Sequence, residues 1–210
     1  KLKVVDSWNE FYETFLSSGN LIRYLYKDFR VLTKTYAGYG TEIIEDNLFH
    51  GEKPARIIFG FVDNDAFTGN KTKTPFKFGS LQSRIQEVGV LVNGQLFPVP
   101  MIKMNFETKN TFEAYHLLMA SLQALPTPDP PIITKEEFDS GDSTLFAFNL
   151  SPDQYSGVDQ KSLFNQPATV RLHIKLREGD ASKTITLVVY YEMQTEMAFN
   201  KTRQVIYRAR

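Results

Sequence analysis

The sequence predicts an all-β fold, an antiparallel β-sandwich, and three observations lead to this class. Seven or more runs rich in β-branched and aromatic residues follow one another along the 210 residues, with turn residues between them. Aromatic residues make up 13% of the chain, with Phe and Tyr far more numerous than Trp, which is typical of strand-rich proteins. A single helical pattern interrupts the strands, so the sequence lacks the strand–helix alternation of a doubly wound α/β fold.

The composition is that of a globular chain able to bury a sizeable core, with 42% hydrophobic residues. Lys plus Arg and Asp plus Glu are equal at 24 each, so overall charge gives no reason to propose nucleic acid as a partner. The chain has no cysteine, which excludes disulfides, cysteine–metal sites and thiol nucleophiles. No apolar run approaches the ~20 residues of a membrane-spanning helix, so we expect no transmembrane segment.

Residues 1–46 are expected to form an N-terminal extension with the first strands, and residues 47–210 the main domain, within one compact fold. A helical spacing of apolar residues predicts a short amphipathic helix within residues 1–20. Two β-type runs follow, at 21–26 and 29–36, and the glycines Gly38 and Gly40 are expected to break them.

The next strands carry the clearest signals. Residues 56–62 form a continuous apolar run, typical of a strand buried on both faces. Residues 85–92 and 95–99 flank Asn93 and Gly94, and an Asn-Gly pair between two β-type runs predicts a hairpin.

Three further runs, at 145–150, 169–176 and 184–191, predict the last strands. The polar residues 177–183 separate the final two runs, so we expect these runs to pair as a hairpin around that loop.

One helix is predicted between the strands. Asn110 is expected to cap it, with Glu113 three residues later as in a capping box. Its expected apolar face indicates core packing rather than a ligand site and consists of Phe112, Tyr115, Leu118, Met119 and Leu122. The proline-rich residues 126–131 are expected to form a stiff surface connector, with a recognition segment as the alternative.

Asp63, Asn64 and Asp65 are the best candidates for metal binding or catalysis, because they follow directly on the buried strand 56–62. A calcium loop of the EF-hand type needs an oxygen ligand at the next alternate position, where this chain has Phe67, so the match fails. A hydrolase site built on the two carboxylates is an alternative. We favour a structural turn, since Asp and Asn side chains bond nearby backbone groups.

The remaining chemistry-bearing residues form no known catalytic pattern. His50, His116 and His173 are far apart in the sequence, and strand alternation places His173 beside Arg171 and Lys175 on a polar face. Phosphate-binding loops, nucleophile elbows and Ser-His-Asp orders are missing from the sequence. We therefore expect a structural or binding protein rather than an enzyme, with no catalytic residue, no cofactor and no metal.

An ordered series of short segments resembles the C-terminal half of the major capsid proteins of Polinton/Maverick elements and adintovirus-like viruses. The resemblance covers about residues 47–207, and residues 1–46 match only loosely. The segments are 47–51, 54–69, 75–78, 90–95, 105–107, 114–115, 144–153, 171–176, 188–192 and 200–205.

The resemblance implies a jelly-roll sandwich of two four-stranded sheets, with the helix at 111–123 outside the core. It also implies lateral self-association into a homotrimeric capsomer, contacts with neighbouring capsomers and other capsid proteins, and a place in a virion capsid assembled inside the host cell. The first of the family's two jelly rolls has no counterpart here, so we expect a fragment or a reduced relative. The alternative function is a jelly-roll module that binds carbohydrate or calcium.

Overall fold

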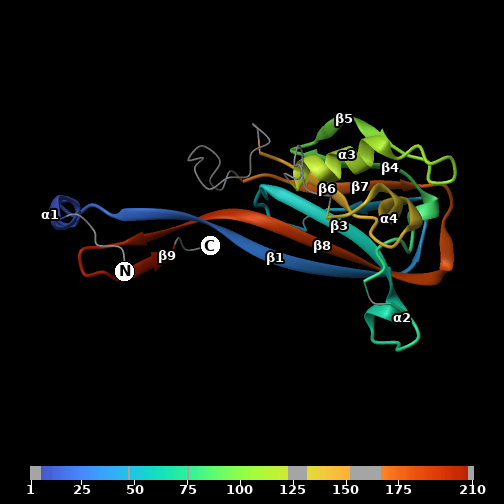
Figure 1. Cartoon of the computed structure of the whole chain (residues 1–210), viewed down its shortest axis with the longest axis horizontal. Helices are drawn as coiled ribbons and strands as arrows, with labels where there is room; N and C mark the ends of the chain where they lie inside the picture. The colour runs from blue at the N-terminus through green and yellow to red at the C-terminus, as the bar shows by residue number, and fades with distance from the viewer. Residues whose placement is uncertain (1–5, 47, 75, 123–131, 152–166, 208–210) are drawn as a thin grey trace. The chain divides into compact units, whose positions relative to one another are not determined.

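A computed structural model describes residues 6–46, 48–74, 76–122, 132–151 and 167–207 of the chain. These residues form two antiparallel sheets, which confirms the predicted β-sandwich (Figure 1). One sheet has the path β1 (Ile22–Tyr39), β8 (Asp180–Phe199), β3 (Arg56–Asp63) and β6 (Phe146–Asn149), with β9 (Val205–Tyr207) also paired to β8. The other has the order β2 (Glu42–Glu45), β7 (Val170–Leu176), β4 (Ile85–Val92) and β5 (Gln95–Lys103). The expectation of two four-stranded sheets is therefore wrong, because β9 gives the first sheet a fifth strand.

The chain divides into two compact units, which we describe separately. The smaller unit comprises residues 1–28, 157–164 and 194–210, and the larger unit, here called the sandwich unit, comprises 29–156 and 165–193. The long strands β1 and β8 contribute residues to both.

In the smaller unit, the predicted N-terminal helix is present as α1 (Asp6–Ser17). Its aromatic residues pack on one another along the helix, with the rings of Phe11 and Phe15 stacked at 6.0 Å. An ion pair of 2.6 Å joins Glu13 of α1 to Arg203, next to the strand β9. The amphipathic prediction for this segment is thus confirmed as a helix with an aromatic face.

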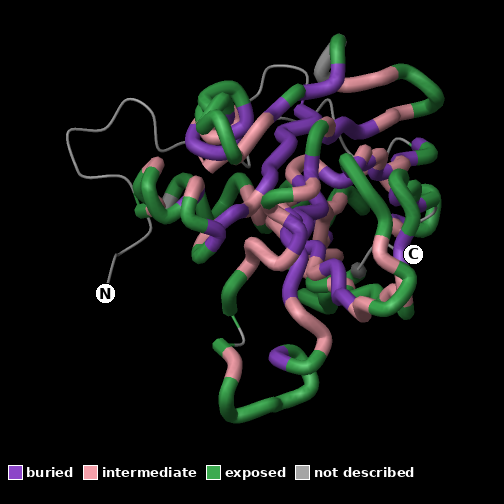
Figure 2. Tube along the Cα trace, turned by 90° about the vertical axis from the view of Figure 1, so that its right-hand side faces the viewer, coloured by how far each residue is buried: buried purple, intermediate pink, exposed green. Residues whose placement is uncertain are grey.

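The core of the sandwich unit follows from strand alternation. In β7, every second residue is buried, and the same alternation places Ile185, Leu187 and Val189 of β8 in the core. Strand β3 lies between β8 and β6, and its residues Gly60, Phe61 and Val62 are all buried, as predicted for a central strand. Figure 2 shows this buried interior surrounded by exposed loops. Each fully buried large apolar side chain stabilises the fold by about 1.5–3 kcal/mol.

The hairpin at Asn93 and Gly94 is confirmed. Strands β4 and β5 pair directly on either side of this turn, and Asn93 and Gly94 have φ values of 52° and 79°. Positive φ at both central residues is what a tight two-residue hairpin turn requires, and Asn and Gly adopt it at the lowest cost.

The predicted hairpin of the last two long strands is wrong. Strand β7 pairs with β2 and β4, whereas β8 belongs to the other sheet. Residues 177–179 therefore connect the two sheets, and β8 already begins at Asp180. Strand period reveals which face of a strand is buried but not which strand lies beside it, so the sequence alone suggested the nearest partner.

The predicted break at Gly38 is wrong, since β1 runs continuously from Ile22 to Tyr39, whereas the strand does end directly before Gly40. Gly38 lies inside the strand with a φ of 88°, and a side chain there would approach the Ala181 carbonyl oxygen to 2.8 Å. This glycine permits a close approach of two backbones rather than ending the strand.

The predicted helix is present as α3 (Phe112–Ser121), but two details differ. The N-cap is Thr111 rather than Asn110, and its side chain makes no capping bond. Asn110 instead pairs with Asn105 in a backbone bridge. Leu118 and Met119 are buried in the core, so the helix does not lie outside it. Phe112, assigned to the apolar face, is 69% exposed.

Two short α-helices and the 3-10 helix η1 (Gln82–Arg84) were not predicted. Helix α2 (Asn64–Phe67) follows β3, and α4 (Lys135–Ser140) carries the capping box of this region, formed by Thr134 and Glu137. The proline-rich residues 126–131 lie outside the described residues. Within the described ranges, every helix is too short or too polar to cross a lipid bilayer.

Candidate functional site

The acidic segment after β3 caps a helix. Asp63 is the N-cap of α2, and its Oδ1 accepts a hydrogen bond of 3.0 Å from the backbone N–H of Asp65. The Lys73 Nζ lies 3.1 Å from Asp63 Oδ2 and 3.0 Å from Asp65 Oδ2, so one ammonium group bridges both carboxylates. Asn64 Oδ1 accepts a hydrogen bond of 3.0 Å from the Thr186 hydroxyl, which ties the helix to β8.

These contacts define the electrostatics of the segment. Partial burial by itself would raise the pKa of Asp63, but the hydrogen bonds from Lys73 and from the Asp65 amide hold that pKa below its usual value. The two carboxylates raise the pKa of Lys73 in turn. The arrangement serves a capped and ion-paired loop, and the prediction that Asp63, Asn64 and Asp65 bind no metal stays a prediction.

The structure does not bring the histidines together with these acids. His173 pairs with Glu42, His116 lies with its ring 6.0 Å from that of Phe112, and His50 occupies a turn with a φ of 51°. Among the described residues, no group of three or more His, Asp or Glu side chains could hold a metal ion.

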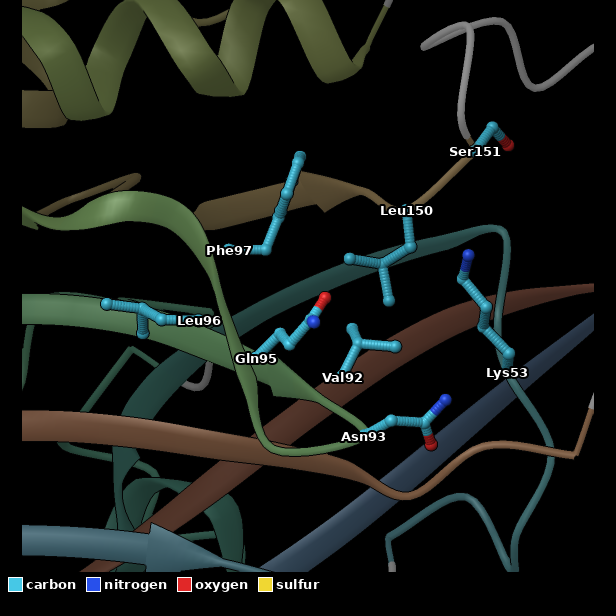
Figure 3. Close-up of a pocket in the computed structure, with 8 residues that line it drawn as sticks. All are labelled: Lys53, Val92, Asn93, Gln95, Leu96, Phe97, Leu150 and Ser151. Atoms are coloured by element: carbon cyan, nitrogen blue, oxygen red, sulfur yellow. The ribbon is translucent and has the colours of Figure 1, made fainter.

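A pocket of about 470 Å³ lies beside the β4–β5 turn (Figure 3). Its described walls combine apolar side chains with two amides, and Lys53 is the ionisable residue among them. The Asn93 side-chain Oδ1 already accepts a hydrogen bond of 3.0 Å from the backbone N–H of Thr169. Such a wall offers binding contacts but no pair of groups for acid–base catalysis. The lining residues are Lys53, Val92, Asn93, Gln95, Leu96, Phe97, Leu150 and Ser151.

The outer surface of the β1–β8–β3 sheet carries a different kind of feature, which we call the apolar face. Phe29 and Val31 of β1 are 56% and 61% exposed, and the Phe29 ring stacks on Tyr190 of β8 at 6.1 Å. Ile58 of β3 lies opposite Tyr190 in the register of the two strands. The apolar face comprises Phe29, Val31, Ile58, Val188 and Tyr190.

A buried charge pair borders the apolar face. Arg56 of β3 is ion-paired with Glu192 of β8, which is only 1% exposed, and also donates to the Ser121 carbonyl oxygen at 2.6 Å. The Tyr190 hydroxyl donates to Glu192 Oε1 at 3.1 Å. Burial, together with the neighbouring Glu192 carboxylate, raises the pKa of Tyr190 to about 12. Sequence reasoning missed this cluster, because its members are 136 residues apart in the chain.

The outer surface of the other sheet, here called the charged face, matches its prediction. Arg171, His173 and Lys175 alternate along β7 with buried residues, and each is paired with an acidic residue. Lys175 Nζ, for example, lies 3.1 Å from Glu87 Oε2 of β4. This is the pattern of a sheet surface in contact with water. The acidic partners are Asp46, Glu42 and Glu87.

No protein-family model matches the sequence, and no curated protein matches it. Among solved structures, a chain of the Sputnik virophage, determined by cryo-EM, matches with a TM-score of 0.50 at 12% identity, covering 89% of this chain and 39% of that chain. The mavirus major capsid protein matches with a TM-score of 0.46 at 10% identity, covering 92% of this chain and 43% of that chain.

The chain thus spans less than half the length of these two solved chains. Sequence identity at this level speaks for the fold alone. The matches to these two chains at partial coverage agree with the resemblance found in the sequence. The chain therefore has the predicted jelly-roll sandwich fold, which it shares with part of the Sputnik virophage chain.

Proposed function

We propose that this chain is a structural capsid protein of a virus or of a virus-derived transposon of the Polinton/Maverick kind. The observation that carries the proposal is the fold similarity to the Sputnik virophage chain, which extends over 89% of the residues. The resemblance of the ordered sequence segments supports the same role independently of the coordinates.

The finer parts of the proposal concern assembly. We propose that copies associate laterally into a homotrimeric capsomer, which contacts neighbouring capsomers and other capsid proteins in the virion and assembles inside the host cell. Within the chain, residues 47–210 would form the jelly-roll domain and residues 1–46 the extension with the first strands. Such a role needs large contact surfaces and no catalytic residue, and the uncharged outer surface of one sheet supports it.

Light scattering coupled to size-exclusion chromatography, followed by electron microscopy of the associated fraction, tests the proposal. We expect association that increases with protein concentration and particles with three-fold symmetry. A chain that stays monomeric at high concentration would contradict the capsomer.

The acidic segment provides a test against the alternative, a calcium-binding jelly-roll module. We expect no calcium binding by calorimetry, because Lys73 already neutralises Asp63 and Asp65. Tight binding that Asp63→Ala abolishes would favour the alternative.

A further inference from the structure

The pocket beside the β4–β5 turn is bounded by backbone segments that are hydrogen-bonded to one another. On the Lys53 side, Glu52 forms a backbone bridge with Pro167. The Leu150 N–H donates to the Ala55 carbonyl oxygen at 2.8 Å, which ties the segment after β6 to the same loop. These bonds hold the lining residues in place, as in a ligand site that is formed before its ligand binds.

Lys53 differs from the other half-buried lysines in the described part of the chain. Each of the others holds its ammonium group within 3.2 Å of a carboxylate or carbonyl oxygen, whereas Lys53 has no such partner among the described residues. A half-buried ammonium group loses hydration, and a bonded oxygen compensates for that loss. Lys53 therefore presents an unpaired cation to the pocket. The bonded lysines are Lys73, Lys135, Lys175 and Lys183.

The polar part of the lining adds a further hydrogen-bond donor. Because Asn93 Oδ1 accepts the hydrogen bond from the Thr169 N–H, the free part of this side-chain amide is its NH₂ group. No Asp or Glu is among the described residues that line the pocket, so the lining itself holds no carboxylate to pair with Lys53. An acceptor for these donors must come from a bound molecule.

The opposite side of the pocket is apolar. In Figure 3, Phe97 stands across the pocket from Lys53, with Leu150 between them. Leu150 is buried, and Phe97 packs against the core together with Val92, so these side chains are fixed in position. The pocket thus has a cationic side and an apolar side, and it is complementary to a molecule with an anionic group on an apolar body.

We infer that this pocket binds a monocarboxylate with an apolar body, whose carboxylate pairs with Lys53 and whose body packs against Phe97 and Leu150. One ammonium group neutralises one negative charge, whereas a phosphate monoester would bring a second charge beside apolar walls. An uncharged ligand would leave Lys53 without its acceptor. The volume of about 470 Å³ lies within the range of small-molecule sites, roughly 300–1,000 Å³. The inference concerns the single chain and does not depend on the capsid role.

Isothermal titration calorimetry on the full native chain tests the inference with octanoate as the probe. Octanamide has the same apolar tail with an uncharged end, and acetate has the charge without the tail. We expect octanoate to bind at least tenfold more tightly than either, because only octanoate satisfies both sides of the pocket. Equal measurable binding of octanoate and octanamide would overturn the inference.

A pair of matched lysine variants places the binding in this pocket. Lys53→Met removes the charge and keeps a long side chain, and Lys71→Met does the same at an exposed lysine that does not line the pocket. We expect Lys53→Met to weaken octanoate binding at least tenfold and Lys71→Met to leave it unchanged. Undiminished binding to a Lys53→Met chain with a native thermal midpoint would overturn the inference. If Lys53→Met does not fold, the comparison of octanoate with octanamide on the native chain decides.

A second arm of the experiment separates two sources of the same chemistry, a free apolar acid and the C-terminal carboxylate of a peptide. The peptide probe is acetyl-leucyl-phenylalanine, and its C-terminal amide is the uncharged control. Binding of octanoate alone would support a free acid as the ligand, and binding of the peptide alone, lost in the amide, would support a chain terminus. Failure of both octanoate and the peptide to bind would overturn the inference.

Discussion

The two outer surfaces of the sandwich unit are built by the same strand period and yet differ in chemistry. On the charged face, Arg171, His173 and Lys175 point outward and pair with acids of the neighbouring strands. On the apolar face, Phe29, Val31 and Tyr190 occupy the equivalent outward positions. The two-residue period of a strand determines which side chains point away from the core. The chemical type of those side chains indicates whether water or another protein surface is expected beside them.

The largest expected effect tests the buried charges beside the apolar face. Arg56→Ala leaves Glu192 without its cationic partner in a buried site, and we expect a loss of about 3–5 kcal/mol in the free energy of unfolding. Urea titration measures it. The double variant Arg56→Met with Glu192→Leu should recover most of the loss, and a single variant that costs under about 1 kcal/mol would show that water reaches the pair.

The second test is the pH dependence of the contribution that Tyr190 makes to stability. Tyr190→Phe removes the hydrogen bond to Glu192 and should cost about 1.5 kcal/mol at neutral pH. The pKa of Tyr190 is raised in the folded chain, so its stabilising contribution is complete below pH ~10 and is lost as the pH rises towards about 12. The difference in the free energy of unfolding between the native chain and Tyr190→Phe should therefore be smaller at pH 11 than at pH 7. An equal difference at both pH values would contradict this.

A smaller change in stability is expected for substitutions of Asp63, at the end of β3 and the margin of the same surface. Asp63→Ala removes the cap of α2 and should cost about 1 kcal/mol, whereas Asp63→Asn keeps the cap and should cost less. Because the pKa of Asp63 is lowered in the folded chain, the contribution of the charge is present at neutral pH and is lost as the pH falls below ~4. Equal losses for both variants would assign the effect to the ion pair with Lys73 instead.

The smallest expected effect is on the charged face. Lys175→Ala removes a half-exposed ion pair with Glu87 and should change the free energy of unfolding by about 0.5 kcal/mol or less. The same titration in 1 M salt should remove even this difference. A loss comparable to that of Arg56→Ala would remove the energetic distinction between the two faces.

Local signals predicted much of the fold. The Asn93–Gly94 hairpin, the central strand around Phe59 and the polar alternation around His173 all depend on neighbouring residues, and the structure confirms them. The class of β-sandwich followed from the number of such segments.

The errors concern partners that are distant in the sequence. Strand β7 was expected to pair with β8 but pairs with β2 and β4. The apolar face was missed for the same reason, because Phe29 and Tyr190 form a patch only when β1 and β8 lie side by side. No local period records which strands become neighbours.

The pairing of β3 has a consequence for synthesis of the chain. Both neighbours of this strand, β6 and β8, are translated after it, and Arg56 must wait for Glu192, 136 residues later. At the usual rates of translation this delay is on the order of ten seconds. Until β6 has been translated, β3, one of the most apolar segments of the protein, has no neighbouring strand to pair with, and its pairing with β8 comes later still. We therefore expect folding to be post-translational and chaperones to increase the yield of native protein.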